Sequence, residues 1–93
     1  MKRRRYRKYL LIDMVGTAAF DDVMEALGKE YHGEVDYDTI GGFVMDLLGH
    51  VPEDNEKVTV HWENVEFKVL SIHEKKIERL RAVIKRDNEE ITD

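Results

Sequence analysis

The sequence predicts an α+β domain of two layers, in which two helices cover a small antiparallel sheet in the order β-α-α-β-β-β. A chain of 93 residues is long enough for one domain only. Residues 18–27 and 40–48 carry apolar side chains at the helical period, whereas residues 57–62, 65–70 and 77–84 read as strands. Helices that are apolar on one face pack against one face of an antiparallel sheet, which gives the two-layer arrangement.

Composition divides the chain into three parts. Residues 1–8 are a basic linker or arm, residues 9–86 form the α+β domain, and residues 87–93 are an acidic tail that is expected to fray. The cations of residues 1–8 also suit a nucleic-acid arm or an anchor to anionic lipid. No aromatic platform or recognition helix accompanies them, so a solvated linker is the favoured interpretation.

The first strand and the first helix follow the linker. Residues 9–14 are apolar on both faces, which predicts a buried strand. Gly16 and Thr17 break this strand and offer a cap for a helix over residues 18–27, which Gly28 closes. The apolar face of this helix consists of Phe20, Val23, Met24 and Leu27. Its acidic group is interpreted as a solvated face rather than a cation site and consists of Asp21, Asp22 and Glu25.

The second helix has a clear start, face and end. Asp38 or Thr39 caps it, and Gly49 followed by Pro52 ends it. Its apolar stripe consists of Ile40, Phe43, Val44, Leu47 and Leu48.

Two glycines, Gly41 and Gly42, stand in the first turn of this helix, where each costs about 1 kcal/mol relative to alanine. The favoured explanation is the close approach of another backbone, so that Gly42→Leu should wedge the helix away from its neighbour. The alternative is a ligand that approaches the amides of this turn.

Three strands in succession are expected to end the domain. Glu63-Asn64 reads as a hairpin turn in which Asn64 takes the positive φ, and residues 74–76 form a second tight turn. The alternation slips at Val69-Leu70, which indicates a bulge or a strand buried on both faces. Tyr31, Tyr37 and Trp62 are expected in the core or at its rim rather than in a stacking box for a ligand.

The residues provide no sign of catalysis. There is no cysteine, and the histidines at 32, 50, 61 and 73 do not fall at metal-ligand spacing. No phosphate-binding loop, dinucleotide fingerprint or nucleophile elbow is present, and no carboxylate stands apart from the others. No apolar run approaches the roughly 20 residues of a membrane span. We therefore expect no catalytic residue, no metal ligand and no enzyme activity.

The middle of the chain resembles the CorC/HlyC-type transporter-associated domain. The resemblance rests on the runs DYDTIGG (36–42), LLG (47–49) and VPE (51–53), and it continues through VEFKVL (65–70) and KIERLR (76–81). It covers roughly residues 9–85 and departs from the family at Met14-Val15-Gly16, where the turn is longer. In the family this domain follows a pair of CBS modules, in proteins linked to magnesium and cobalt efflux and in haemolysin-like proteins.

The resemblance implies a non-catalytic accessory domain in the cytoplasm, at the inner face of the membrane as part of a longer protein. Its expected partners are the CBS or membrane domains of the parent protein, or a second copy bound weakly. No cofactor is expected. The alternative is a site for flavin-adenine dinucleotide (FAD) or an adenine nucleotide, because the family fold is related to one half of certain flavin-binding domains. The ligand-binding residues would then be Thr39, Gly41 and Gly42. Nucleic acid is not expected, because an acidic body repels phosphate.

Overall fold

The computed structural model describes residues 2–5, 8–54 and 56–85. Two helices and five strands follow one another in the chain. They are β1 (Lys2–Arg5), β2 (Tyr9–Val15), α1 (Phe20–Leu27), α2 (Ile40–Leu48), β3 (Thr59–Trp62), β4 (Val65–His73) and β5 (Lys76–Lys85). From β2 onward this is the predicted order, and the predicted α+β class is confirmed.

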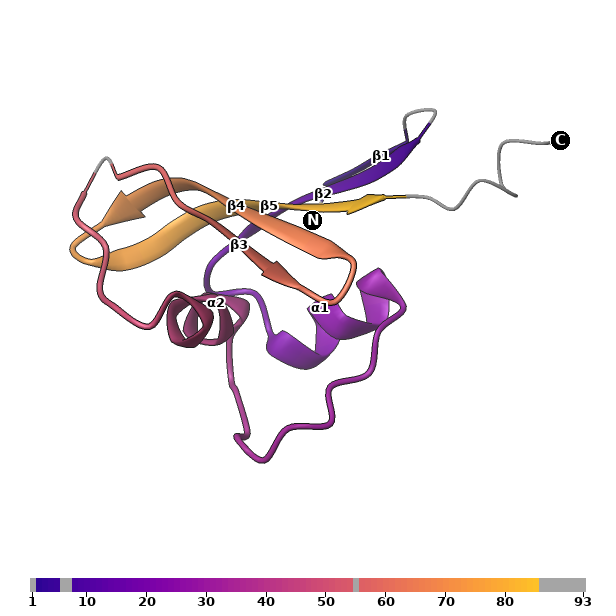
Figure 1. The fold of residues 1–93 in the computed structure, drawn as a ribbon, viewed down its shortest axis with the longest axis horizontal. Helices are drawn as coiled ribbons and strands as arrows, with labels where there is room; N and C mark the ends of the chain where they lie inside the picture. The colour runs from indigo at the N-terminus through magenta and orange to yellow at the C-terminus, as the bar shows by residue number, and fades with distance from the viewer. Residues whose placement is uncertain (1, 6–7, 55, 86–93) are drawn as a thin grey trace, which may run out of the picture.

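All five strands belong to one antiparallel sheet with the order β1-β2-β5-β4-β3. Figure 1 shows both helices on the same side of this sheet, so the molecule has two layers. Strand β2 lies between β1 and β5, and its residues Tyr9 to Val15 pair with Lys85 to Arg79 of β5.

Residues 2–5 differ from the expected linker, because they form strand β1 at the edge of the sheet. Lys2 pairs with Asp13 and Arg5 with Leu10. Backbone pairing needs no apolar side chain, and charged residues are common on edge strands because they discourage further pairing. The expected acidic tail at 87–93 lies outside the described residues.

Helix α1 begins two residues later than predicted, and its cap is not made by Gly16 or Thr17. The N-cap is Ala19, whose side chain makes no capping bond. Ala19 is extended and forms an antiparallel bridge with Thr39. Within it the amide of Phe20 donates to Asp38 O at 3.0 Å and the amide of Ile40 donates to Ala18 O at 3.0 Å. Each helix start is thus capped by the segment that precedes the other helix.

The remaining helix boundaries agree with the sequence. The Thr39 side chain accepts from the amide of Gly42, and Gly28 and Gly49 take the left-handed conformation at the two C-caps. In the strands, the predicted bulge lies between Val69 and Ser71. The hairpin turn is present at the predicted place, but the positive φ belongs to Glu63 and not to Asn64.

The core fills the space between the helices and the inner face of the sheet. Its fully buried members include Ile12, Val23, Ile40, Val44, Val65, Phe67 and Leu80. No polar or charged residue of the described chain is buried. The core is therefore held by apolar packing, as expected for a domain without disulfides.

Aromatic rings join the helical layer to the sheet. Phe43 of α2 lies at the centre, with ring centroids 5.0 to 6.2 Å from those of Phe20, Tyr31, Tyr37, Trp62 and Phe67. Most of these pairs are edge-to-face, a favourable geometry for aromatic side chains. Tyr31, Tyr37 and Trp62 are half-buried at the rim of this cluster, which is the predicted place for them.

Candidate functional site

The predicted ligand residues Thr39, Gly41 and Gly42 line one side of a surface cavity of about 350 Å3. The structure completes the cavity from two segments that the sequence did not associate with it. These are the turn after β2, with Gly16 and Thr17, and the start of β5, with Lys76 and Ile77; Met45 of α2 also lines the cavity. Only the pairing of β2 with β5 brings them together, which no local sequence pattern reveals.

Backbone segments from the turn after β2, from α2 and from β5 meet at Gly16, beside this cavity. Its amide donates to Glu78 O of β5 at 2.9 Å, and its carbonyl accepts from the amide of Gly41 at 2.8 Å. A Cβ on Gly41 would lie 2.8 Å from Gly16 O, and a Cβ on Gly16 would overlap the carbonyl oxygen of Ile77. The expected close approach of another backbone is therefore confirmed for Gly41.

Gly42 does not share this role, so the expectation that Gly42→Leu wedges the helix away is wrong. Gly42 is exposed, and a Cβ there would meet only Thr39 Oγ1 at 3.4 Å. Helical period explains the difference, because Gly41 lies on the side of buried Val44, whereas Gly42 lies on the side of Met45 and exposed Asp46. The fold thus gives no reason for the absence of a side chain at Gly42.

The first amides of α2 are all engaged within the protein. Their acceptors are Ala18 O for Ile40 (3.0 Å), Gly16 O for Gly41 (2.8 Å), the Thr39 hydroxyl for Gly42 (3.1 Å) and Thr39 O for Phe43 (3.3 Å). A helix start binds phosphate through free amides. This helix start has no free amide. To bind a phosphate it would have to break existing hydrogen bonds, including those of Ile40 and Gly41 to the segment before α1.

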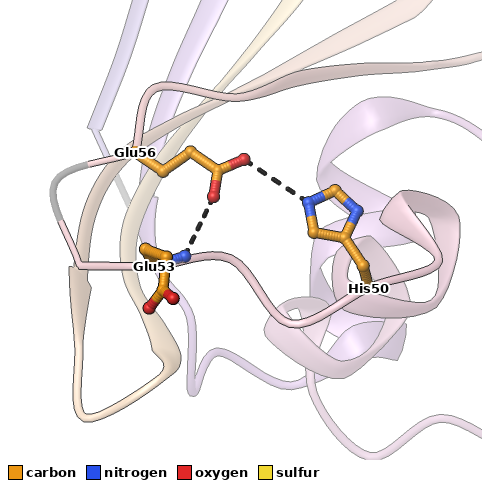
Figure 2. A network of polar contacts seen from close by, with 3 residues as sticks. All are labelled: His50, Glu53 and Glu56. Atoms are coloured by element: carbon orange, nitrogen blue, oxygen red, sulfur yellow. Dashed lines mark hydrogen bonds and ion pairs between the residues drawn. The ribbon is translucent and has the colours of Figure 1, made fainter.

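The acidic turn after α2 is closed by a small polar network, shown in Figure 2. The Glu56 carboxylate accepts from the Glu53 amide at 2.9 Å and lies 3.4 Å from His50 Nε2. These contacts, the Glu53 amide first, lower the pKa of Glu56. A carboxylate held ionised in this way stabilises the turn, which is a structural role.

Each histidine lies beside a glutamate at the surface. The Nε2-to-carboxylate distances are 3.4 Å for His32–Glu30, 3.4 Å for His50–Glu56, 3.0 Å for His61–Glu66 and 3.6 Å for His73–Glu74. The four pairs are spread over different elements, and no three potential ligands among the described residues come close enough to hold a metal ion.

A second, wider hollow of about 640 Å3 lies between α1 and residues 29–37. Asp21 and Glu25 of the predicted solvated face are on its rim, with further carboxylates from the loop. It is open to solvent and belongs to the acidic side of the molecule.

One ionisable group of the helical layer has a strongly shifted pKa. The Tyr37 hydroxyl donates to Asp46 Oδ2 at 2.7 Å, and this bond, with burial and the nearby carboxylate charge, raises the pKa of Tyr37 to about 12. Because the bond favours the protonated phenol, its contribution to stability is present below pH 10 and is lost as the pH rises through about 12.

We expect the Asp46→Asn variant to return the pKa of Tyr37 toward 10. Ultraviolet titration of tyrosinate, taken as the difference between each protein and its Tyr37→Phe counterpart, isolates this residue. An unchanged pKa in Asp46→Asn would assign the shift to burial alone.

Comparison with known proteins connects this fold to transport proteins. The model of the transporter-associated domain family, CorC_HlyC, matches residues 11–86. The chain is 32% identical over 71 residues, 76% of its length, to the magnesium and cobalt efflux protein CorC of Escherichia coli K12. It is 35% identical over 54 residues, 58% of its length, to CorC of Pasteurella multocida. The matches span 23% and 17% of these two relatives, so the chain corresponds to about a fifth of their length.

Solved structures of such domains have the same fold. A CorC_HlyC domain from Haemophilus ducreyi superposes with a TM-score of 0.66 at 26% identity, covering 83% of this chain and 99% of that one. The region associated with a putative Mg2+ and Co2+ transporter (CorC) from Neisseria meningitidis gives 0.63 at 28% identity, covering 87% and 94%.

Proposed function

This chain belongs to the CorC_HlyC family of transporter-associated domains, and from that premise we propose that it is a non-catalytic accessory domain that acts by docking. The parent would be a magnesium and cobalt efflux protein or a haemolysin-like protein. Its CBS modules or membrane part would be the partners, with the domain on the cytoplasmic side of the membrane. None of the helices in the described residues is long and apolar enough to cross a bilayer.

The observation that carries the docking proposal is the bare surface at Gly42. A glycine inside a helix costs about 1 kcal/mol relative to alanine, and no packing in this domain requires one at this position. Gly42 also lines the 350 Å3 cavity, together with Thr39, Met45 and the β5 start. A side chain at position 42 would project into this cavity and block the entry of a side chain from a partner.

The described residues support docking better than chemistry. The cavity contains two hydroxyl groups and one amine, from Thr17, Thr39 and Lys76, and no carboxylate or imidazole. General acid–base catalysis needs a titratable group poised near the working pH. A surface with few polar groups around an apolar hollow is instead typical of a protein contact.

A domain exchange tests the proposal. Residues 9–86 of this chain would replace the matching segment of E. coli CorC, and Co2+ efflux from cobalt-loaded cells would be measured by elemental analysis. We expect the chimera to export Co2+ faster than a CorC from which the segment has been deleted, at equal protein levels. A chimera no better than the deletion would contradict a general docking role.

A site for FAD is the competing function, and the cavity beside Gly41 and Gly42 is the feature that favours it. Two features argue against an FAD site. The first amides of α2 already have acceptors within the protein. The carboxylates of Asp36, Asp38 and Asp46 also stand near the start of α2 in the sequence, and their charges repel a pyrophosphate. We therefore expect the purified chain to bind oxidised FAD no more tightly than about 1 mM. Titration calorimetry measures this directly, and saturable binding in the low micromolar range would reverse the ranking of the two functions.

Self-association is a further part of the proposal. Strand β3 is a four-residue edge of the sheet, and no strand of the described residues pairs with its other side. Such an edge can pair with another chain. A weak contact between copies through this edge would be compatible with docking through the Gly42 surface.

A further inference from the structure

The sheet has an outer face that no described element covers. Figure 1 shows both helices on the opposite side. Because side chains alternate along a strand, the residues between the core positions share this face. We call it the outer face; its residues are Tyr9, Leu11, Asp13, Val15, Thr59, His61, Glu66, Lys68, Leu70, Ser71, Glu78, Arg79, Arg81, Val83 and Lys85.

Charge is partitioned between the two layers of the molecule. Every charged residue from 20 to 56 is acidic except Lys29. The strands of the sheet are predominantly basic: their cations are Lys2, Arg3, Arg4, Arg5, Lys68, Lys76, Arg79, Arg81 and Lys85, against the acids Asp13, Glu66 and Glu78. The net charge of −5 therefore hides a basic layer.

Two of the three acids on the outer face, Asp13 and Glu66, lie beside cations, and the third, Glu78, accepts a hydrogen bond from the Ser71 hydroxyl at 3.1 Å. The Arg81 guanidinium donates two hydrogen bonds, of 2.6 and 3.2 Å, to the Asp13 carboxylate. The Glu66 carboxylate lies 3.0 Å from His61 Nε2 and 3.7 Å from Lys68 Nζ. Arg79 and Lys85 make no ion pair with another described residue, so their charges are available to an external anion.

Apolar groups lie between these cations. Leu11 pairs directly with Val83 across β2 and β5, and this pair is flanked by Tyr9 opposite Lys85. Further along the same two strands, Val15 stands opposite Arg79. Tyr9 and Val15 remain 42% and 46% exposed. Apolar and aromatic side chains interleaved with cations suit the boundary between lipid headgroups and acyl chains.

We propose that the outer face binds an anionic phospholipid surface. The cations of the outer face would contact the headgroups while the acidic helical layer points away, about a Debye length or more from the charged plane. The same face of a second copy is a poor occupant, because cations would meet cations. Nucleic acid is also disfavoured, because Tyr9 is the only Phe, Tyr or Trp among the described residues of the outer face, and single strands need a row of such rings. This inference goes beyond the proposed function and does not depend on it.

Vesicle co-sedimentation tests the inference. The purified chain would be mixed with vesicles of equal parts phosphatidylglycerol and phosphatidylcholine, or of phosphatidylcholine alone, in 50 and 300 mM NaCl. We expect binding to the anionic vesicles only, with at least a tenfold weaker partition coefficient at the higher salt. Each cation near such a surface contributes about fivefold, so Arg79→Glu with Lys85→Glu should lower the coefficient by about 25-fold or more.

The matched control is Lys29→Glu with Lys57→Glu, which reverses the same number of charges outside the outer face. We expect it to change the coefficient by less than about threefold. Three outcomes would each overturn the inference. The two double variants could lose binding equally, or the protein could bind neutral vesicles as well as anionic ones. The protein could also bind an oligonucleotide through Arg79 and Lys85 while it fails to bind vesicles. Circular dichroism of both variants confirms that they are folded.

Discussion

Replacing Phe43 with alanine is expected to lower the free energy of unfolding by about 3–5 kcal/mol. Phe43 is 2% exposed, and its ring contacts five other aromatic rings from α1, the loop before α2, β3 and β4. The truncation leaves a cavity at the point where the helical layer meets the sheet. A domain of this size has only about 5–15 kcal/mol of stability, so a large part of it would be lost.

Urea unfolding followed by circular dichroism measures this effect. Val51→Ala is the matched control, because Val51 is apolar but 57% exposed, and its loss should stay within about 0.5 kcal/mol. If Phe43→Ala cost less than about 1 kcal/mol, the aromatic cluster would not be what holds the two layers together.

Alanine at Gly16 or Gly41 is expected to be destabilising, whereas alanine at Gly42 is not. At Gly16 the new methyl group would overlap the carbonyl oxygen of Ile77, and at Gly41 it would crowd Gly16 O. Both obstacles are backbone atoms, so no side-chain rotation relieves them. Overpacking costs about 1–3 kcal/mol and occasionally more; we expect Gly41→Ala within that range and Gly16→Ala at its upper end or beyond.

Gly42→Ala provides the internal comparison, one residue further along the same helix. Its methyl group meets open space apart from Thr39 Oγ1, so better helix propensity should raise stability slightly, by up to about 1 kcal/mol. Urea midpoints of the three variants decide the matter. Equal losses at Gly41 and Gly42 would mean that the whole turn is packed and would remove the basis for a docking surface.

The features that the sequence predicted well are those set by neighbouring residues. The stripe of α2 placed Ile40, Phe43 and Val44 in the core, and the Thr39 cap and the Gly49 end were correct because capping depends on a few adjacent groups. The bulge after Val69 was visible as a slip in the alternation.

Long-range pairing limited the rest. Strand β1 was missed because a run of lysine and arginine has no apolar alternation, and its order comes from the backbone of β2. Helix α1 starts late because Ala19 pairs with Thr39, twenty residues away. The cavity at Gly42 needs Lys76 and Ile77, which only the β2–β5 register brings beside α2. The helical period alone puts Gly41 on the buried side of α2 and Gly42 on its exposed side, so the difference between the two glycines could have been predicted from the sequence.

We propose that position 42 has no side chain because a docking partner needs the space there, and not because the fold requires a glycine. Co2+ efflux by the E. coli CorC chimera carrying Gly42→Leu tests it most directly, with Gly42→Ala as the control. The leucine would fill the cavity opening while leaving the isolated domain as stable as its parent. We expect the efflux rate of the leucine chimera to fall to that of the deletion, and the alanine chimera to stay close to the unsubstituted one. An efflux rate unchanged by leucine, in a chimera that otherwise works, would contradict the claim.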